Sequence, residues 1–322
     1  MEKNNKTVTT DFILLGLWPE FSHLVILIFL ILLVYLMAVI GNAVLILLIW
    51  LDSRLHCPMY FLLSQLSLID VALISTTVPK MATNFFSGKR TISQIGCGSQ
   101  ILFSLTLGIS ECLLLTLMSY DRYIAICNPL RYSVMMSHTI CKQMVIGSWV
   151  GGAITSLVHT AYVMHLPICH PREIPHFLCE VMALLELTCE DISAYVNSVV
   201  VSSFLVVLIP LSLILASYIR IFLAVVHMNS PEGKNKALAT CFSHLCVVSL
   251  YFGPAVLVYM RPGSFKTPKI NQSLFMFNAI LTPMLNPLIY SLRNKDVIAA
   301  MKSIVISRCF LKKVKNHQAC YT

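Results

Sequence analysis

Long apolar stretches separated by short polar ones dominate this chain. Seven windows between charged residues each exceed the roughly 20 residues that a helix needs to cross the hydrocarbon core of a bilayer. The windows lie between Glu20 and Asp52, Arg54 and Lys80, Arg90 and Asp121, Lys142 and Arg172, Asp191 and Arg220, Lys236 and Arg261, and Lys269 and Arg293. Backbone in lipid must satisfy its own hydrogen bonds, and the alternation of a membrane β-barrel is missing, so each window is predicted to be a helix.

Composition supports the same interpretation. The 322 residues are 57% hydrophobic and only 11% charged, which is too apolar for an ordinary soluble domain. We predict an all-α membrane protein, a seven-transmembrane helix bundle followed by a short amphipathic helix at Lys295–Ser303. One domain spans residues 1–322, with a tail at 1–23, the helix bundle at 24–292 and a second tail at 293–322.

The distribution of basic residues predicts the orientation. If the amino terminus is extracellular, the inner segments hold 14 of the 23 Lys and Arg residues, in agreement with the positive-inside rule. The net charge of +9 is then mostly a property of the cytoplasmic face. No basic patch with interleaved aromatic residues points to a nucleic acid.

Four of the 12 cysteines fall on the predicted outside, namely Cys97, Cys169, Cys179 and Cys189. An even number of cysteines in an oxidising compartment predicts two disulfides, and four cysteines allow three connectivities.

Five segments carry a family resemblance that spans nearly the whole chain. The third window ends in Met-Ser-Tyr-Asp-Arg-Tyr-Ile-Ala-Ile-Cys-Asn-Pro-Leu-Arg-Tyr, residues 118–132. The others are the pair Gly41-Asn42, Leu-His-Cys-Pro-Met-Tyr-Phe-Leu-Leu-Ser at 55–64, Lys-Ala-Leu-Ala-Thr-Cys-Phe-Ser-His-Leu at 236–245, and Pro-Met-Leu-Asn-Pro-Leu-Ile-Tyr-Ser-Leu-Arg-Asn at 283–294. In this order and spacing they resemble the olfactory (odorant) receptors, a branch of the rhodopsin-like G-protein-coupled receptors.

The resemblance implies a function and the residues that transmit it. We expect a plasma-membrane odorant receptor that binds a small volatile ligand, couples to a heterotrimeric G protein of the olfactory stimulatory type and raises cyclic AMP. Residues with an implied role in activation are Asp121, Arg122, Tyr123, Asn286, Pro287 and Tyr290. Arg122 can pair with Asp121 or reach polar groups of the sixth helix, which gives two arrangements for a ligand to bias.

The same resemblance implies a ligand site within the bundle. Helical spacing places four residues on one face of the third helix, and similar receptors complete the pocket from the fifth, sixth and seventh helices. The expected ligand residues are Ser104, Leu105, Gly108, Ile109, Ser202, Val206, Phe252, Ala255, Tyr259 and Ala279. Hydroxyls of Ser104, Ser202 and Tyr259 suit a carbonyl, ether or alcohol. The third-helix face carries no carboxylate, which argues against a cationic amine.

Two carboxylates lie at mid-membrane depth, Asp70 and Glu111, and each must face the interior and find partners. Asn42 and Asn286 are candidate partners. Related receptors suggest a sodium ion between the acids, while the alternative is that one or both are protonated and simply hydrogen-bonded. Intramembrane acids also occur in proton-relay transporters, but no repeated halves stand out here.

Further expectations concern covalent features and the remaining alternatives. The resemblance implies a Cys97–Cys179 disulfide, which leaves Cys169–Cys189 as the second pair. Asn5-Lys-Thr is a glycosylation acceptor, and Cys309 is either palmitoylated or a free thiol. No nucleophile–base set or nucleotide loop indicates an enzyme, and no cofactor or metal site is expected. The alternatives are a receptor of the same architecture for a non-odorant molecule outside the nose, and a transporter.

Overall fold

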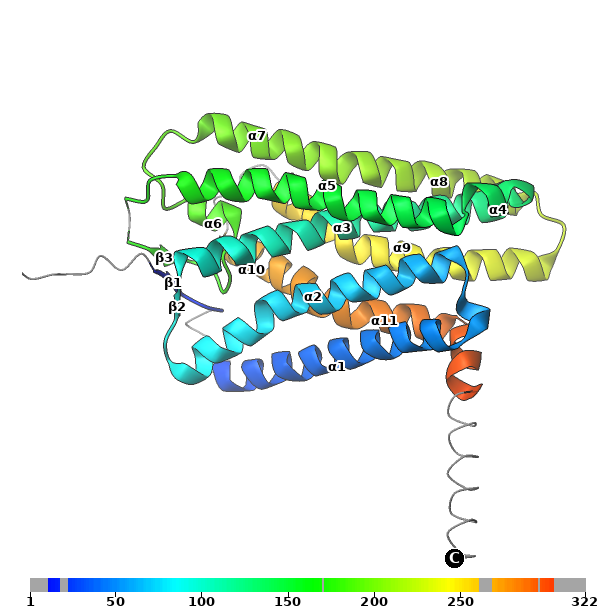
Figure 1. Cartoon of the computed structure of the whole chain (residues 1–322), viewed down its shortest axis with the longest axis horizontal. Helices are drawn as coiled ribbons and strands as arrows, with labels where there is room; N and C mark the ends of the chain where they lie inside the picture. Colours follow the sequence, from blue (N-terminus) through cyan, green and yellow to red (C-terminus); the bar gives the residue numbers. More distant parts are fainter. Residues whose placement is uncertain (1–10, 18–22, 170, 261–267, 295, 304–322) are drawn as a thin grey trace, which may run out of the picture.

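The computed structural model of this chain describes residues 11–17, 23–169, 171–260, 268–294 and 296–303. Within these residues, seven helical spans are long and apolar enough to cross a membrane, as predicted. Figure 1 shows them side by side as an elongated bundle. The spans are α1 (Leu24–Leu51), α2 (Pro58–Ser87), α3 (Gln94–Cys127), α5 (His138–His165), α7 with α8 (Ser193–Ser203 and Ile209–Val226), α9 (Pro231–Tyr259), and α10 with α11 (Pro268–Met276 and Thr282–Arg293).

Short elements lie at the two ends of the bundle. The sheet end, at the left of Figure 1, carries β1 (Phe12–Leu14), β2 (Thr91–Ile92), β3 (Glu173–Ile174) and the short helix α6 (Val181–Leu185). The α4 end, at the right, carries α4 (Tyr132–Met135) and two 3₁₀ turns, η1 (Ser53–Leu55) and η2 (Pro129–Arg131). Residues 296–303 form a further helix that runs steeply across the end of α11 in Figure 1, close to the predicted Lys295–Ser303.

The outside of the bundle is apolar. Helix α1 is the clearest case, because large side chains such as Ile26, Phe29 and Ile40 are each more than half exposed. A soluble protein rarely exposes so much continuous apolar surface. This surface fits the hydrocarbon of a bilayer, which makes the chain a multi-pass membrane protein.

Two spans contain a wide π-helical segment directly before a proline. Segment η3 (Phe204–Leu208) precedes Pro210, and η5 (Phe277–Leu281) precedes Pro283. Proline has no amide hydrogen, and its ring crowds the carbonyl one turn earlier, so a locally widened turn relieves the clash. Each π segment changes the rotational register between the two halves of its span.

Helix α1 packs against α11 and hydrogen-bonds to it next to Pro287. Pro287 lacks the amide hydrogen that would normally pair with the carbonyl of Pro283, four residues earlier. Asn42 Nδ2 donates to that carbonyl oxygen at 2.8 Å, and also to Ala38 O at 3.0 Å. The neighbouring Gly41 lets the helices approach, since a β-carbon placed on it would lie 3.2 Å from the ring of Pro287. These two contacts with α11 explain why a glycine and an asparagine stand at positions 41 and 42.

Helices α3 and α5 meet through small side chains. Ser148, Gly152, Ser156 and Thr160 recur every four residues along α5, and all four are buried. Ser110 Oγ of α3 donates to the Ser148 carbonyl at 3.2 Å. Small residues at this spacing allow close backbone approach, which is how membrane helices gain packing contacts without a hydrophobic driving force.

The sheet end is closed by strand pairing and disulfides. Strand β1 lies between the other two strands, antiparallel to β2 and parallel to β3. The structure joins Cys97 to Cys179 and Cys169 to Cys189. The first bond ties the start of α3 to the loop after α5, and the second closes a loop within that same segment. Residues 12–14, which the sequence analysis assigned to a tail, are therefore part of the folded sheet end.

Candidate functional site

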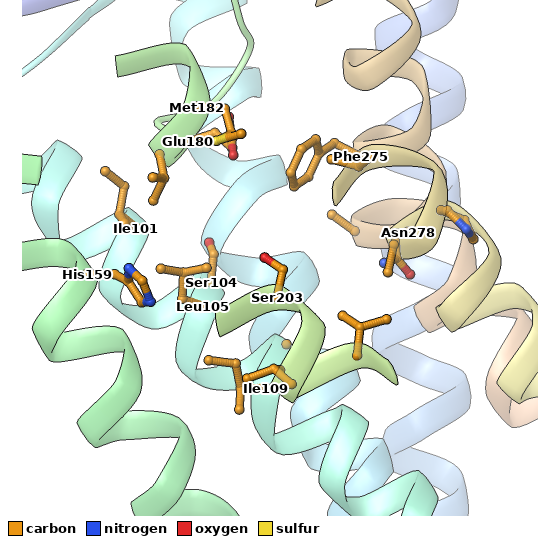
Figure 2. A pocket seen from close by; sticks show the side chains of 18 of the residues that line it. Ile101, Ser104, Leu105, Ile109, His159, Glu180, Met182, Ser203, Phe275 and Asn278 are labelled. Atoms are coloured by element: carbon orange, nitrogen blue, oxygen red, sulfur yellow. The ribbon is translucent and has the colours of Figure 1, made fainter. Parts of the chain in front are cut away.

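A cavity lies under the sheet end, between α2, α3, α5, α7, α9 and α10, and the segment at residues 178–182 forms its roof. Figure 2 shows Glu180 and Met182 at one end of this cavity and Ile109 at the other. Its volume is about 180 Å³. An engineered cavity of about 150 Å³ in another protein holds a benzene molecule, so a compact organic molecule fits here.

Eight of the ten residues expected to contact ligand line this cavity. They are Ser104, Leu105, Gly108, Ile109, Ser202, Val206, Ala255 and Ala279. The four from α3 share one face, as the helical spacing indicates. The structure thus places them together, and whether they bind ligand remains a prediction.

Phe252, which was also expected to contact ligand, is not among the residues that line this cavity. It is 2% exposed and packs in the core of the bundle, with its ring 5.1 Å from that of Tyr251. Tyr251 lines the cavity instead, and its hydroxyl donates to Gly108 O. One residue along a helix turns the side chain by about 100°, which separates the two roles. The side chain of Tyr259 lies outside the described residues.

Several hydroxyls around the cavity already donate to backbone carbonyls. Ser202 Oγ donates to Val199 O at 2.9 Å, and Thr155 Oγ1 donates to Gly151 O at 2.9 Å. Ser104 Oγ is different, since it is buried without a hydrogen-bond partner among the described residues. Ser203, which the sequence analysis did not single out, also lines the cavity, and Figure 2 shows it beside Ser104.

Glu180 brings a carboxylate to the cavity, and the sequence analysis missed it. Its Oε2 accepts from the backbone amide of Ala183 at 3.0 Å and so caps α6. Burial raises the pKa of Glu180 to about 7, although the amides of Met182 and Ala183 oppose that change. The implied Cys97–Cys179 disulfide could have predicted this position. Cys97 lies at the start of α3 and Glu180 follows Cys179, so the disulfide brings Glu180 close to the α3 face.

A histidine also borders the cavity. His159 of α5 lines it, and its Nδ1 lies 3.1 Å from the hydroxyl of Tyr195. On the opposite side, Phe275 and Asn278 contribute an aromatic ring and an amide, and Figure 2 shows both facing the space from the seventh span. The lining is thus largely apolar, with polar groups at a few defined positions, which is typical of a small-molecule site.

The mid-membrane acids lie deeper, toward the centre of the bundle. Both are buried, with Asp70 fully inaccessible and Glu111 2% exposed. Asn286 Nδ2 donates to the two carboxylate oxygens of Asp70 at 3.1 and 3.0 Å, one of the two expected partnerships. Asn42 is not a partner of either acid, because its amide is used by backbone carbonyls of α1 and α11. Glu111 Oε1 has no partner among the described residues.

Of the expected activation residues, Asp121, Arg122, Tyr123 and Tyr290 lie toward the α4 end, whereas Asn286 lies beside Asp70. The carboxylate of Asp121 accepts from the Tyr132 hydroxyl at 2.8 Å and forms no ion pair with Arg122 among the described residues. The Nε of Arg122 is buried without a partner there, as is the hydroxyl of Tyr290.

A second polar contact lies nearby, where the Tyr218 hydroxyl and His244 Nδ1 are 2.7 Å apart, between α8 and α9. Tyr123 is half-buried, and its ring packs near that of Tyr120. Pro287 breaks the hydrogen-bond ladder of α11 one residue after Asn286. Two expected modification sites, Asn5 and Cys309, lie outside the described residues.

Comparison with known proteins gives one consistent answer. A sequence model described as olfactory receptor matches residues 31–308. The human protein named Olfactory receptor 2AJ1 is 50% identical over 314 residues, which cover 98% of this chain and 96% of that protein. Human Olfactory receptor 2T27 is 52% identical over 309 residues, covering 96% and 97%, and human Olfactory receptor 2L3 is 51% identical over 304 residues, covering 94% and 97%.

Proposed function

Because the chain belongs to the olfactory receptor family, and is thus an odorant receptor that signals through a G protein to cyclic AMP, we propose that the cavity under residues 178–182 is its odorant site. The observation that carries this proposal is the cavity itself. It holds about 180 Å³ and is lined mainly by apolar side chains, and Ser104 Oγ has no hydrogen-bond partner among the described residues. A small, mostly apolar volatile molecule with one polar group matches that lining.

We infer that odorant binding favours a second arrangement at the α4 end. Arg122 is a buried cation without an ion-pair partner among the described residues, and it lies close to the Tyr218–His244 contact and to Tyr290. Such a charge is costly where it lies and has alternative polar groups to engage. A shift of α9 or α11 that gives Arg122 a different partner would open this end to a G protein of the olfactory stimulatory type.

The proposed orientation places the sheet end outside the cell, in the plasma membrane. The two disulfides lie at that end, which matches an oxidising compartment. Of the 23 Lys and Arg residues, 14 fall in the segments that this orientation puts inside the cell. An epitope tag on the amino terminus should therefore be stained on intact cells, whereas a tag on the carboxyl terminus should require permeabilisation.

We propose a sodium site at the mid-membrane acids. Asp70 and Glu111 supply oxygen ligands of the kind that hard cations prefer, and the unpartnered Glu111 Oε1 fits an ion that is not part of the chain. If the proposal holds, replacing sodium with choline changes the basal cyclic AMP level of the native receptor and leaves that of Asp70→Asn unaltered.

A cavity-filling experiment tests the odorant site. Ser104→Phe places a ring in the cavity, while Ser249→Phe adds the same ring on the exposed face of α9. Cells expressing each variant are screened with an odorant panel, with cyclic AMP as the readout and surface staining as the control. We expect Ser104→Phe to abolish every response and Ser249→Phe to preserve them. Unchanged odorant potencies in Ser104→Phe at normal surface level would refute the site.

A further inference from the structure

We propose that Glu180 makes this cavity selective for odorants with a protonated basic nitrogen, and that it disfavours carboxylic acids. The inference rests on the proposed odorant site and deepens it by naming the ligand class. It reverses the expectation from the third-helix face, which lacks a carboxylate, because the acid comes from the roof segment instead.

The charge balance of the lining carries the argument. Among the described residues that line the cavity there is no lysine, arginine or aspartate, and Glu180 is the one carboxylate in this mainly apolar lining. Among the described residues the ion pair within 4 Å is that of Arg54 with Asp52, so no described lysine or arginine pairs with Glu180. An ammonium group in the cavity would supply a cationic partner. A second carboxylate would meet a like charge in a low dielectric, which is costly.

The geometry holds the acid in place for that role. Glu180 caps the short helix α6 through the amide of Ala183, which fixes the carboxyl group at the roof. Cys179, directly before it, is bonded to Cys97 of α3 and is 1% exposed. Turning the carboxyl group away from the cavity would break the Ala183 hydrogen bond, while the disulfide holds the backbone directly before it. A ligand group placed at that end of the cavity must meet it.

The pKa of Glu180 lies close to neutral pH. Burial is the main cause that raises its pKa to about 7, and the nearby carboxylate of Glu186 raises it further. The other titratable groups around it are His159 of α5, which borders the same cavity, and Tyr195 of α7, which pairs with His159. An ammonium ligand would favour the ionised carboxylate, whereas a neutral ligand would leave the acid partly protonated.

Capping of α6 is the competing explanation, and the substitution must separate the two. Glu180→Gln removes the charge but keeps an oxygen that can accept from Ala183, so it preserves the cap. Glu186→Gln is the matched control, since it makes the same change in the same loop at a residue that does not line the cavity.

The experiment measures cyclic AMP in cells that express native receptor, Glu180→Gln or Glu186→Gln at equal surface level. The probes are two series on fixed skeletons: benzylamine, benzyl alcohol, benzaldehyde and benzoic acid, then hexan-1-amine, hexan-1-ol, hexanal and hexanoic acid. For native receptor we expect an amine to act at a concentration at least about tenfold below that of its matching acid. In Glu180→Gln the amine should lose at least about tenfold in potency, because one partner of a buried charge pair is gone.

The outcomes separate this inference from the odorant site itself. Alcohol and aldehyde responses should survive in Glu180→Gln, and all responses should survive in Glu186→Gln. If alcohols, aldehydes or acids act at the same concentrations as the matching amines, or if Glu180→Gln weakens every probe alike, the amine selectivity is refuted while the odorant site stands. Silence of the surface-expressed native receptor to the whole panel would contradict both.

Discussion

The packing of α3 against α5 gives a prediction whose size follows from the structure. A β-carbon on Gly152 would lie 2.6 Å from Ser110 Oγ and 2.8 Å from the backbone oxygen of Thr106, whereas ordinary contact begins at 3.4 Å. The serine can rotate, but the Thr106 oxygen belongs to a helix backbone. Gly152→Ala therefore forces α3 and α5 apart by several tenths of an ångström.

The cost of that separation can be estimated. Overpacking of a well-packed interface costs about 1–3 kcal/mol. The Ser110–Ser148 hydrogen bond is weakened as well, and bonds between membrane helices average about 0.6 kcal/mol. Since 1 kcal/mol shifts the melting temperature of large domains by about 2–4 °C, Gly152→Ala should melt several degrees below the native receptor.

Two glycines of the same helix serve as matched controls. A β-carbon on Gly147 meets nothing within 4 Å, and one on Gly151 lies 3.9 Å from Leu113. Both changes should be neutral or slightly stabilising, because alanine favours a helix over glycine. The assay is thermal unfolding of purified receptor in nanodiscs, with surface level in cells as a second readout. If Gly152→Ala and Gly147→Ala have the same melting temperature, the account of the α3–α5 contact is refuted.

Three further predictions concern the kink, the cavity and its roof. Asn42→Ala leaves the Pro283 carbonyl unpaired in the membrane and should cost about 1–3 kcal/mol in thermal unfolding. Ser203→Ala should change the potency of active odorants in the cyclic AMP assay, whereas Ser202→Ala should not, because the Ser202 hydroxyl is committed to Val199 O. Because the pKa of Glu180 is raised to about 7, acidifying the medium to about pH 6 neutralises it, so amine odorants should lose potency there and alcohols should not.

Each of these has a result that contradicts it. An Asn42→Ala receptor as stable as Asn42→Gln would remove the role assigned to the Pro283 contact. Equal effects of Ser202→Ala and Ser203→Ala would mean that hydrogen bonding to the helix backbone does not decide which hydroxyl meets ligand. Amine potency that is unchanged between about pH 6 and pH 8, or that changes equally in Glu180→Gln, would exclude the titration of Glu180 as its cause.

The raised pKa of Glu180 also has a consequence for stability. The folded state holds its proton up to about pH 7, whereas an ordinary glutamate loses it near 4.5. The folded state therefore binds more protons in this range, and stability from this group falls as the pH rises from about 4.5 to 7.

The spans were predictable from sequence because the bilayer imposes a length and excludes charge. The first window, between Glu20 and Asp52, becomes α1 at Leu24–Leu51. The α3 face of the cavity was predictable for a similar reason, since helical periodicity holds without interruption through Ser104 and Ile109. A regular element allows side-chain directions to be read from spacing alone.

The remaining features depend on irregular elements that carry no periodicity. Strands of two or three residues, such as β2 and β3, have no pattern to recognise. The π segments of the fifth and seventh spans shift register between their halves, which a fixed period of 3.6 does not include. Glu180 lies in a loop whose position is set by a disulfide, so it could be placed only by reasoning from the Cys97–Cys179 pair.

Strand β1 has a practical meaning for anyone who shortens or tags this protein. It pairs with two strands that are some 80 residues apart in the chain, at Ile92 and Ile174. Its Phe12 and Leu14 are buried together with the roof of the cavity. A truncation that stops before Asp11 keeps both strand pairings of β1. A truncation that removes Leu14 would remove both strand pairings above the cavity. The resulting loss of odorant responses would then be mistaken for a defect in trafficking.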